Sequence, residues 1–254
     1  MLVSPGMPRV LSALVWLLLC APALAITGNA PQASGPRHAV MIVGSQGTFC
    51  TGAAIARDLV LTAAHCVQPG SDYKLVEFDA AHTPRLLDVR TVMRHPQFNL
   101  QTLLAHRATA DVALLKLAQP LPAAVVPATL GDGSFAPKVG GTLTVYGYGL
   151  SLRGDGKTGG TLRTATLTIT GQPGNLQVRL VDPVGGGTRA GLGACTGDSG
   201  APVFDDATLI GVVSWSTGPN LADGCGGMTG VTPLNLYRAW IVDTAKKMNS
   251  PVRP

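Results

Sequence analysis

Short β-prone runs recur along this chain, separated by turns that are rich in glycine and proline. The sequence contains 32 glycines and 19 prolines, and both residue types interrupt regular structure. Frequent short strands between such turns are typical of β-barrels and β-sandwiches. Examples of these runs are residues 39–43, 60–63, 86–93, 112–117, 143–146, 162–169, 176–181 and 209–214. The sequence therefore predicts an all-β protein with one large or two small domains.

One helix is expected, over residues 234–248 near the C-terminus. Leu236, Trp240, Ile241 and Ala245 recur there at helical spacing, which gives such a helix one apolar face. No other stretch shows a convincing helical period.

The first 25 residues have the features of a secretory signal peptide. Arg9 gives a basic start, and residues 10–20 form an apolar run too short to cross a bilayer comfortably. Ala23-Leu24-Ala25 then matches the small-residue cleavage pattern. A retained membrane anchor is the alternative. We expect export to a periplasm or to the extracellular space, and a mature chain that begins at Ile26.

Charge excludes some classes of partner. The formal net charge is +5 and only 13% of residues are charged, with no run of lysine or arginine. Nucleic-acid binding is therefore not expected. No stretch after residue 25 is apolar enough to span a bilayer, so we expect a mature form free of the membrane. We also expect a monomer.

The stretch from Gly193 to Pro202 places Ser199 between glycines and beside an aspartate. A serine hydroxyl is a weak nucleophile that needs a base to take its proton. Flanking glycines allow tight backbone turns whose N–H groups can face an oxyanion. The same composition is common in ordinary turns, so this stretch alone does not establish a nucleophile.

Two other stretches offer the groups that such a serine lacks. His65 follows an apolar, strand-like run in Thr62-Ala63-Ala64-His65-Cys66, and Asp111 begins another such run. Each has an ordinary alternative, as a core histidine or a turn-forming aspartate. Their occurrence together with Ser199, in the order His65, Asp111, Ser199, indicates a catalytic triad.

With these motifs the sequence resembles the trypsin-like serine proteases of the chymotrypsin fold, over nearly all of the chain after residue 25. The resemblance implies two six-stranded antiparallel Greek-key barrels followed by a C-terminal helix. The barrels would cover about residues 26–127 and 128–233, and the helix about 234–248. The site would lie in the cleft between the barrels.

The resemblance also implies the chemistry of a serine endopeptidase that acts on proteins or peptides through an acyl-enzyme. Ser199 would attack the scissile carbonyl, His65 would transfer the proton, and Asp111 would orient the imidazole. The backbone N–H groups of Gly197 and Ser199 would form the oxyanion hole. No cofactor is implied.

Four cysteines remain after residue 25, an even number in an exported protein. The resemblance pairs Cys50 with Cys66, beside the histidine, and Cys195 with Cys225, across the binding pocket. A zinc site is the alternative, disfavoured because no two of them form a Cys-x-x-Cys pair. The segment in which some relatives bind calcium lacks a well-spaced pair of glutamates, so no metal is expected.

Cleavage before Ile26 would free an ammonium group. In the family, this group inserts and pairs with the aspartate before the catalytic serine, here Asp198. A buried ion pair of this kind is stable only when both charges are satisfied together. We predict that signal peptidase itself makes the active N-terminus. The alternatives are that Ile26 is merely the first mature residue, or that the protein is a zymogen that needs a later activation step.

Substrate contacts carried over from the family fall on six residues: Gly193, Ala194, Ser214, Trp215, Ser216 and Gly230. Residues 214–216 would pair with an extended substrate as an added strand, and Ser214 would also support Asp111. Trypsin has an aspartate at the pocket floor where this chain has Gly193, and a desolvated cation without a partner is strongly disfavoured. Gly230 would keep one wall open, and Ser216 would narrow the other.

We therefore predict cleavage after neutral, small-to-medium apolar residues rather than after Arg or Lys. Asp223, in a nearby loop, is the residue that would instead favour a basic side chain. The main alternative to an enzyme is a non-catalytic binding protein on a protease scaffold. Such relatives usually lack a triad residue, and all three are present here. An esterase or a processing enzyme with one narrow target uses the same triad chemistry.

Overall fold

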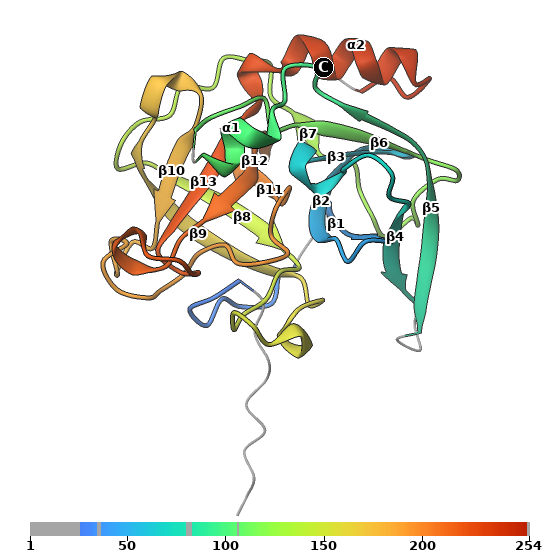
Figure 1. The fold of residues 1–254 in the computed structure, drawn as a ribbon. Coiled ribbons are helices and arrows are strands. Elements are labelled where there is room, and N and C mark those ends of the chain that lie inside the picture. Colours follow the sequence, from blue (N-terminus) through green and yellow to red (C-terminus); the bar gives the residue numbers. More distant parts are fainter. Residues whose placement is uncertain (1–25, 35–36, 80–82, 106, 253–254) are drawn as a thin grey trace, which may run out of the picture.

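Two β-barrels stand side by side in the computed structural model, which describes residues 26–34, 37–79, 83–105 and 107–252 (Figure 1). The predicted signal peptide lies outside the described residues. The strands are β1 (Ala39–Gly44), β2 (Phe49–Ala56), β3 (Leu59–Thr62), β4 (Tyr73–Phe78), β5 (Pro84–Arg94), β6 (Ala113–Leu117), β7 (Thr129–Leu130), β8 (Thr142–Gly147), β9 (Arg163–Gly171), β10 (Val178–Val181), β11 (Pro202–Asp205), β12 (Thr208–Ser216) and β13 (Met228–Pro233). The two α-helices are α1 (Leu100–Leu104) and α2 (Arg238–Lys247).

The first barrel closes in the order β1-β2-β3-β6-β5-β4, with antiparallel pairing throughout. Its interior is aliphatic because the strands carry branched side chains at inward positions. Ile42, Leu75 and Leu115 are fully buried there. The end of β3 and the start of β6 are paired beside this core, through Thr62 and Ala113.

The second barrel runs β11-β8-β9-β10-β13-β12 and is closed by pairing of β11 with β12. The short strand β7 adds to β12 in parallel on the outside. Leu143, Leu167 and Leu180 fill the interior. The prediction of two six-stranded antiparallel barrels with a C-terminal helix is confirmed by this architecture and by the solved structures described below.

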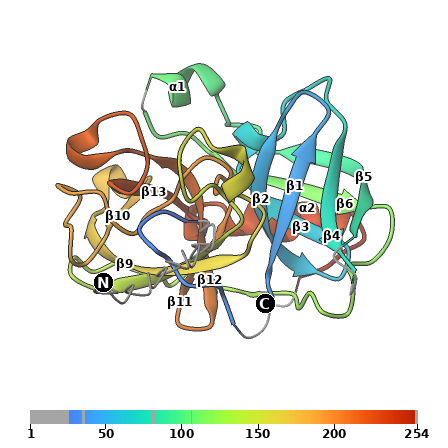
Figure 2. The same cartoon turned by 90° about the horizontal axis from the view of Figure 1, so that it is seen from below.

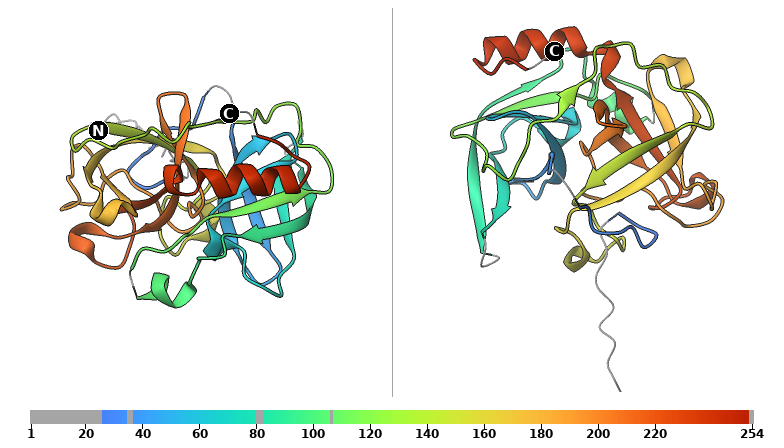
Figure 3. Two further views of the ribbon diagram at one scale, coloured as in Figure 1. Left: turned by 90° about the horizontal axis from the view of Figure 1, so that it is seen from above. Right: turned by 180° about the vertical axis from the view of Figure 1, so that it is seen from behind.

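The C-terminal helix starts later than the sequence indicated. A 3-10 turn occupies Leu234–Leu236, and α2 begins only at Arg238. Leu236, expected on the apolar face, is 46% exposed, whereas Ile241 and Ala245 pack on a cluster that includes Leu59 of the first barrel. The helix therefore returns from the second barrel to cover the first (Figure 3). In the described part of the chain, no helix has the length and apolar character needed to cross a membrane.

The segment that begins at Ile26 lies against the second barrel, although the sequence placed it at the start of the first. Thr27 pairs with Gly193 and Gln32 pairs with Arg163, so the segment runs along the second barrel (Figure 2). Ile26 is completely buried in that barrel's core cluster, together with Ala194 and Ala201. The start of the described chain is therefore anchored beside the loop that carries Ser199.

Candidate active site

His65 and Asp111 meet because they follow and precede two paired strands. His65 lies in a 3-10 turn directly after β3, and Asp111 lies just before β6. Thr62 at the end of β3 is paired with Ala113 at the start of β6. His65 Nδ1 lies 2.8 Å from Asp111 Oδ2, and the His65 backbone N–H donates to Asp111 Oδ1 at 2.9 Å. Both carboxylate oxygens thus fix the histidine.

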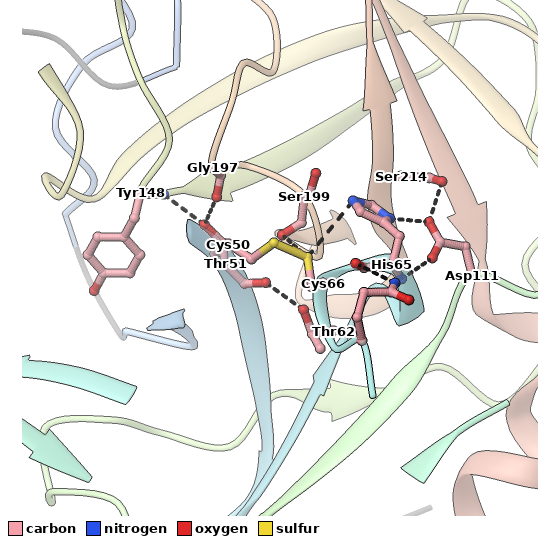
Figure 4. The surroundings of a disulfide bond; sticks show 11 residues. Cys50, Thr51, Thr62, His65, Cys66, Asp111, Tyr148, Gly197, Ser199 and Ser214 are labelled. Atoms are coloured by element: carbon pink, nitrogen blue, oxygen red, sulfur yellow. Dashed lines mark hydrogen bonds and ion pairs between the residues drawn. A yellow bond between two sulfur atoms is a disulfide. The ribbon is translucent and has the colours of Figure 1, made fainter. Parts of the chain in front are cut away.

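Ser214 adds a third contact to this carboxylate. The register of β12 shifts between Val213 and Trp215, which leaves Ser214 at a bulge, and bulges often redirect a side chain beside an active site. Ser214 Oγ donates to Asp111 Oδ2 at 2.6 Å. The sequence prediction that Ser214 would support Asp111 corresponds to this hydrogen bond (Figure 4).

Asp111 is only 1% exposed. Burial alone would raise its pKa, but the neighbouring His65, together with hydrogen bonds from His65 and Ser214, brings the pKa below its usual value. The group therefore stays a carboxylate, which can only accept hydrogen bonds. His65 Nδ1 must then carry a proton, so Nε2 of the neutral ring is the free base.

Ser199 stands beside His65 at the edge of the second barrel (Figure 4). Its backbone carbonyl accepts a hydrogen bond from the Thr51 N–H at 2.9 Å. Ser199 and His65 line one open cleft of about 480 Å³. Within the described residues no hydrogen bond joins Ser199 Oγ to His65, and such bonds often tighten only when substrate is bound.

The backbone around Ser199 offers two free donors. In the part of the chain that the structure describes, the N–H groups of Gly197 and Ser199 donate to no protein acceptor. Gly197 has φ +96°, and a Cβ there would lie 2.4 Å from Phe49 Cε1. Only glycine meets both conditions. These are the two residues that the sequence predicted for an oxyanion hole.

Thr51 on β2 is a positioning residue that the sequence analysis missed. Its side chain is fully buried and donates to the Gly197 carbonyl at 2.8 Å, while it accepts from the Tyr148 N–H at 3.1 Å. Thr62 Oγ1 in turn donates to the Thr51 carbonyl at 2.8 Å. Through this contact, β2 of the first barrel positions the loop of the second barrel that carries Gly197 and Ser199. No sequence signal distinguishes Thr51 from an ordinary strand threonine.

Asp198 is completely buried beneath Ser199. It accepts hydrogen bonds from the backbone N–H groups of Gly149 at 2.8 Å and Cys195 at 2.9 Å. Burial nevertheless raises the pKa of Asp198 to about 7. A carboxyl group with this pKa is well suited to a cationic partner, because a nearby ammonium would favour its charged form.

The disulfides join Cys50 to Cys66 and Cys195 to Cys225, the pairs that the resemblance implied. The first bond lies under His65 (Figure 4). Cys50, His65 and Cys66 come close enough to form a potential metal group. Because both sulfurs are joined in the disulfide, this trio offers no thiolate to a metal.

The pairing of β12 with β13 decides which residues stand opposite Trp215 and Ser216. Strand register places Thr229 opposite Ser216, and Gly230 opposite Trp215. A Cβ on Gly230 would lie 2.0 Å from Trp215 Cε2, so this glycine accommodates the indole rather than opening the pocket. Thr229 is buried, and its Oγ1 accepts from the Ala194 N–H at 3.0 Å.

The other predicted pocket residues lie near these strands. Gly193 approaches Gly226 so closely that a Cβ on Gly193 would lie 3.1 Å from Gly226 Cα. Asp223 is exposed and lines the cleft at its mouth. Gly193 and Ala194, predicted to form the pocket floor, are both buried and carry no charged side chain.

Two antiparallel barrels with serine, histidine and aspartate at their junction define the chymotrypsin-fold class of serine hydrolases. The family profile described as Trypsin matches residues 26–241, and the chain belongs to this trypsin family.

Its relatives share the fold over most of their length. A trypsin from Phaedon cochleariae is 31% identical over 76% of this chain and 77% of its own. The snake venom serine protease rhinocerase 4 from Bitis rhinoceros is 28% identical over 86% of both chains. Among solved structures, human heparin binding protein matches with a TM-score of 0.69 and 26% identity, over 89% of this chain and 100% of its own. Mouse neuropsin, a serine protease, has a TM-score of 0.65 and 25% identity, over 84% and 97%.

Proposed function

We propose that this protein is a secreted serine endopeptidase that cleaves after small neutral residues. The observation that carries the proposal is the linked set Ser214–Asp111–His65, with His65 and Ser199 lining the same cleft. Secretion is usual for this family, and the predicted signal peptide supplies the route of export.

In this mechanism, Ser199 Oγ attacks the carbonyl carbon of the scissile bond while His65 Nε2 takes its proton. The carbonyl oxygen becomes an oxyanion that accepts from the N–H groups of Gly197 and Ser199. His65 then gives its proton to the leaving amine, and an ester of Ser199 remains. Water attacks this ester with His65 again as base, which releases the acid and restores Ser199.

The preference before the cut follows from the residues at the pocket wall. Gly193 and Ala194 provide no carboxylate for an Arg or Lys side chain, and a cation buried without a partner is strongly disfavoured. Thr229 and Ser216 face each other where glycines would leave room. We therefore propose that the pocket takes alanine-sized to valine-sized side chains.

Digestion of an unstructured protein tests both the activity and the preference. We expect fragments that end in small neutral residues, with few that end in Arg or Lys. Thr229→Gly should raise kcat/KM for Leu or Phe relative to Ala by about tenfold or more, since each methylene accommodated changes discrimination on that scale. Thr229→Ser, which keeps the hydroxyl that Ala194 N–H contacts, is the matched control. Cuts mainly after Arg or Lys would overturn the preference, and absence of cleavage would overturn the proposed activity.

Maturation is the second part of the proposal. Signal peptidase would cut between Ala25 and Ile26, and the freed ammonium would pair with Asp198. Support comes from the buried position of Ile26 in the cluster that contains Ala194 and Ala201, and from a buried carboxyl group whose pKa is raised to about 7. Mass spectrometry of the exported protein should find Ile26 at the N-terminus of the active form.

The pH dependence of stability distinguishes a paired from an unpaired Asp198. In a variant that keeps one alanine before Ile26, the native carboxyl holds its proton more tightly than the unfolded chain does. Its free energy of unfolding should therefore decrease as pH rises from about 3.8 to about 7. In the chain that begins at Ile26, the ammonium gains a partner and its pKa rises. The stabilisation that the ammonium of Ile26 gives to the folded chain should therefore persist from about pH 3.8 to about pH 7 and be lost at alkaline pH.

Denaturant unfolding of both forms across pH measures this difference, and Ile26→Val in the mature chain serves as a control that keeps the ammonium. Equal pH profiles for the extended and mature chains would contradict the ion pair. Full activity of an exported chain with a different N-terminus would contradict the maturation step.

A non-catalytic binding role is the remaining alternative. One structural neighbour is named for binding heparin and not for proteolysis, so the fold alone does not decide between the two. The complete triad and the two free N–H donors favour catalysis. Labelling with a fluorophosphonate decides this point, because it reacts only with an activated serine.

A further inference from the structure

A second hollow, of about 630 Å³, adjoins the active-site cleft. Ser216 and Asp223 line both hollows. Ser214, which contacts Asp111, and Trp215 line the second hollow as well. Residues 47–50 line the cleft but not this second hollow. We call it the distal groove, and it is lined among others by Leu104, Arg107, Arg179, Trp215, Leu221 and Asp223.

Arg179 enters the distal groove because of the sheet register. Gly230 on β13 is paired with Trp215 on one side and with Arg179 of β10 on the other. Directly paired residues of an antiparallel sheet place their side chains on the same face. The indole of Trp215 lies over Gly230. Arg179 therefore follows Trp215 and Gly230 in one row across the three strands, on the same face of the sheet as the indole.

Arg107 reaches the same groove from the first barrel. It follows α1, whose first turn is capped by Asn99 accepting from the Thr102 N–H at 2.9 Å. The Arg107 N–H donates to the Thr102 carbonyl at 3.0 Å, which turns the chain back at the end of the helix. Leu103 and Leu104 at the end of α1 line the groove together with Arg107.

Neither guanidinium has a hydrogen-bond or ion-pair partner among the described residues. Asp223 at the rim is exposed and is the one acidic residue that lines the groove in the described chain. Two cations against one anion leave the groove with net positive charge. Leu104 and Leu221 are 63% and 67% exposed, which gives the groove an apolar rim.

We propose that the distal groove selects substrates with an acidic side chain two to four residues before the scissile bond, recognised by Arg107 and Arg179. The inference deepens the proposed protease function and rests on it. An extended peptide that pairs with residues 214–216 advances about 3.3 Å per residue, so its residues before the cut pass over Trp215 and between the two arginines. A carboxylate there accepts charge-assisted hydrogen bonds from either guanidinium.

Matched quenched peptides test this proposal. They share one small residue before the cut and carry Ala, Glu or Lys at each of the second, third and fourth positions. We expect the peptide with Glu at the best position to have a kcat/KM about tenfold higher than that of the Ala peptide. Each arginine should contribute a factor of about 2 to 5 to this difference. Lys should fall below Ala. High salt should shrink the Glu advantage, because exposed charges are screened within about 3 Å at 1 M salt.

Variants assign the effect to the groove. Arg107→Gln and Arg179→Gln should each reduce the Glu advantage, and the double variant should abolish it, while kcat/KM for the Ala peptide stays within about twofold. Arg85→Gln, an exposed position on β5 of the first barrel, is the control for general loss of positive charge and should leave the preference unchanged.

Peptide binding to Ser199→Ala separates the two proposals. If wild type cleaves Glu and Ala peptides equally, or if the double variant keeps the preference, the distal groove is not an acidic subsite while the protease function stands. If no peptide is cleaved, the protease function fails. Binding to Ser199→Ala then still decides whether the groove prefers Glu over Ala, and equal binding would overturn the inference.

Discussion

Ser199→Ala is expected to lower kcat by about 10⁶-fold and to leave only the weak catalysis that binding and an oxyanion hole provide. The variant removes the atom that bonds to the substrate carbonyl, so no acyl-enzyme can form. The fold should survive, because the backbone carbonyl of residue 199 accepts a hydrogen bond from the Thr51 N–H. This bond does not involve the side chain that the substitution removes. Hydrolysis of a small-residue peptide by wild type and variant measures the loss.

An intact-mass spectrum after fluorophosphonate treatment gives the matching chemical readout. Wild type should gain one adduct on Ser199, and Ser199→Ala should gain none. Ser216→Ala is the control, since it removes another serine of the same cleft and should keep the adduct. An adduct that persists on Ser199→Ala, or near-normal turnover, would contradict the assignment. An unlabelled wild-type protein would favour the binding-protein alternative.

The parts of the fold that the sequence predicted are those whose signal is local. The run at residues 112–117 and the turn around Ser199 can be identified without knowing what packs against them. Strands β2 and β13 give a weaker pattern in the sequence, because they are buried along almost their whole length and are rich in Ala, Gly and Thr. A strand covered on both faces loses the alternation that identifies a half-exposed strand.

Strand β4 is hard to identify from the sequence for a different reason. Its burial alternates, but one inward position holds Glu77, which pairs with Arg37 at 2.5 Å. A charged residue at an inward position argues against a strand until its partner is known. The two residues lie far apart in the sequence, so only the fold brings them together.

The residue that faces Ser216 across the sheet could not be predicted from the sequence. The register of β12 shifts at Ser214, and Ser216 is paired with Thr229 while Gly230 is paired with Trp215. A shift of one residue exchanges the two faces of a strand. Bulges depend on tertiary contacts, here the hydrogen bond from Ser214 to Asp111. The local sequence of β12 contains no pattern that predicts a bulge.

Asp111→Asn is expected to lower kcat by about 10⁴-fold, the size known for the equivalent change in another enzyme of this family. Asn is nearly isosteric, so the contacts to His65 and Ser214 can be kept in shape. Its amide can donate to His65 Nδ1, which then becomes an acceptor and moves the ring proton to Nε2. The nitrogen that faces Ser199 would thus carry a proton and could not act as the base.

Stability at acid pH gives an independent check on this argument. The native pKa of Asp111 lies below its usual value, so its stabilisation is complete above the unfolded pKa and is lost as pH falls through the native one. The free energy of unfolding of Asp111→Asn should not show this decrease at acid pH. The variant should still unfold cooperatively near neutral pH. Ser214→Ala is the matched control, because it removes one donor to the carboxylate but keeps the His65 bond, and should lose only about 10- to 100-fold in kcat. A folded Asp111→Asn with near wild-type kcat would show that Asp111 does not set the histidine tautomer.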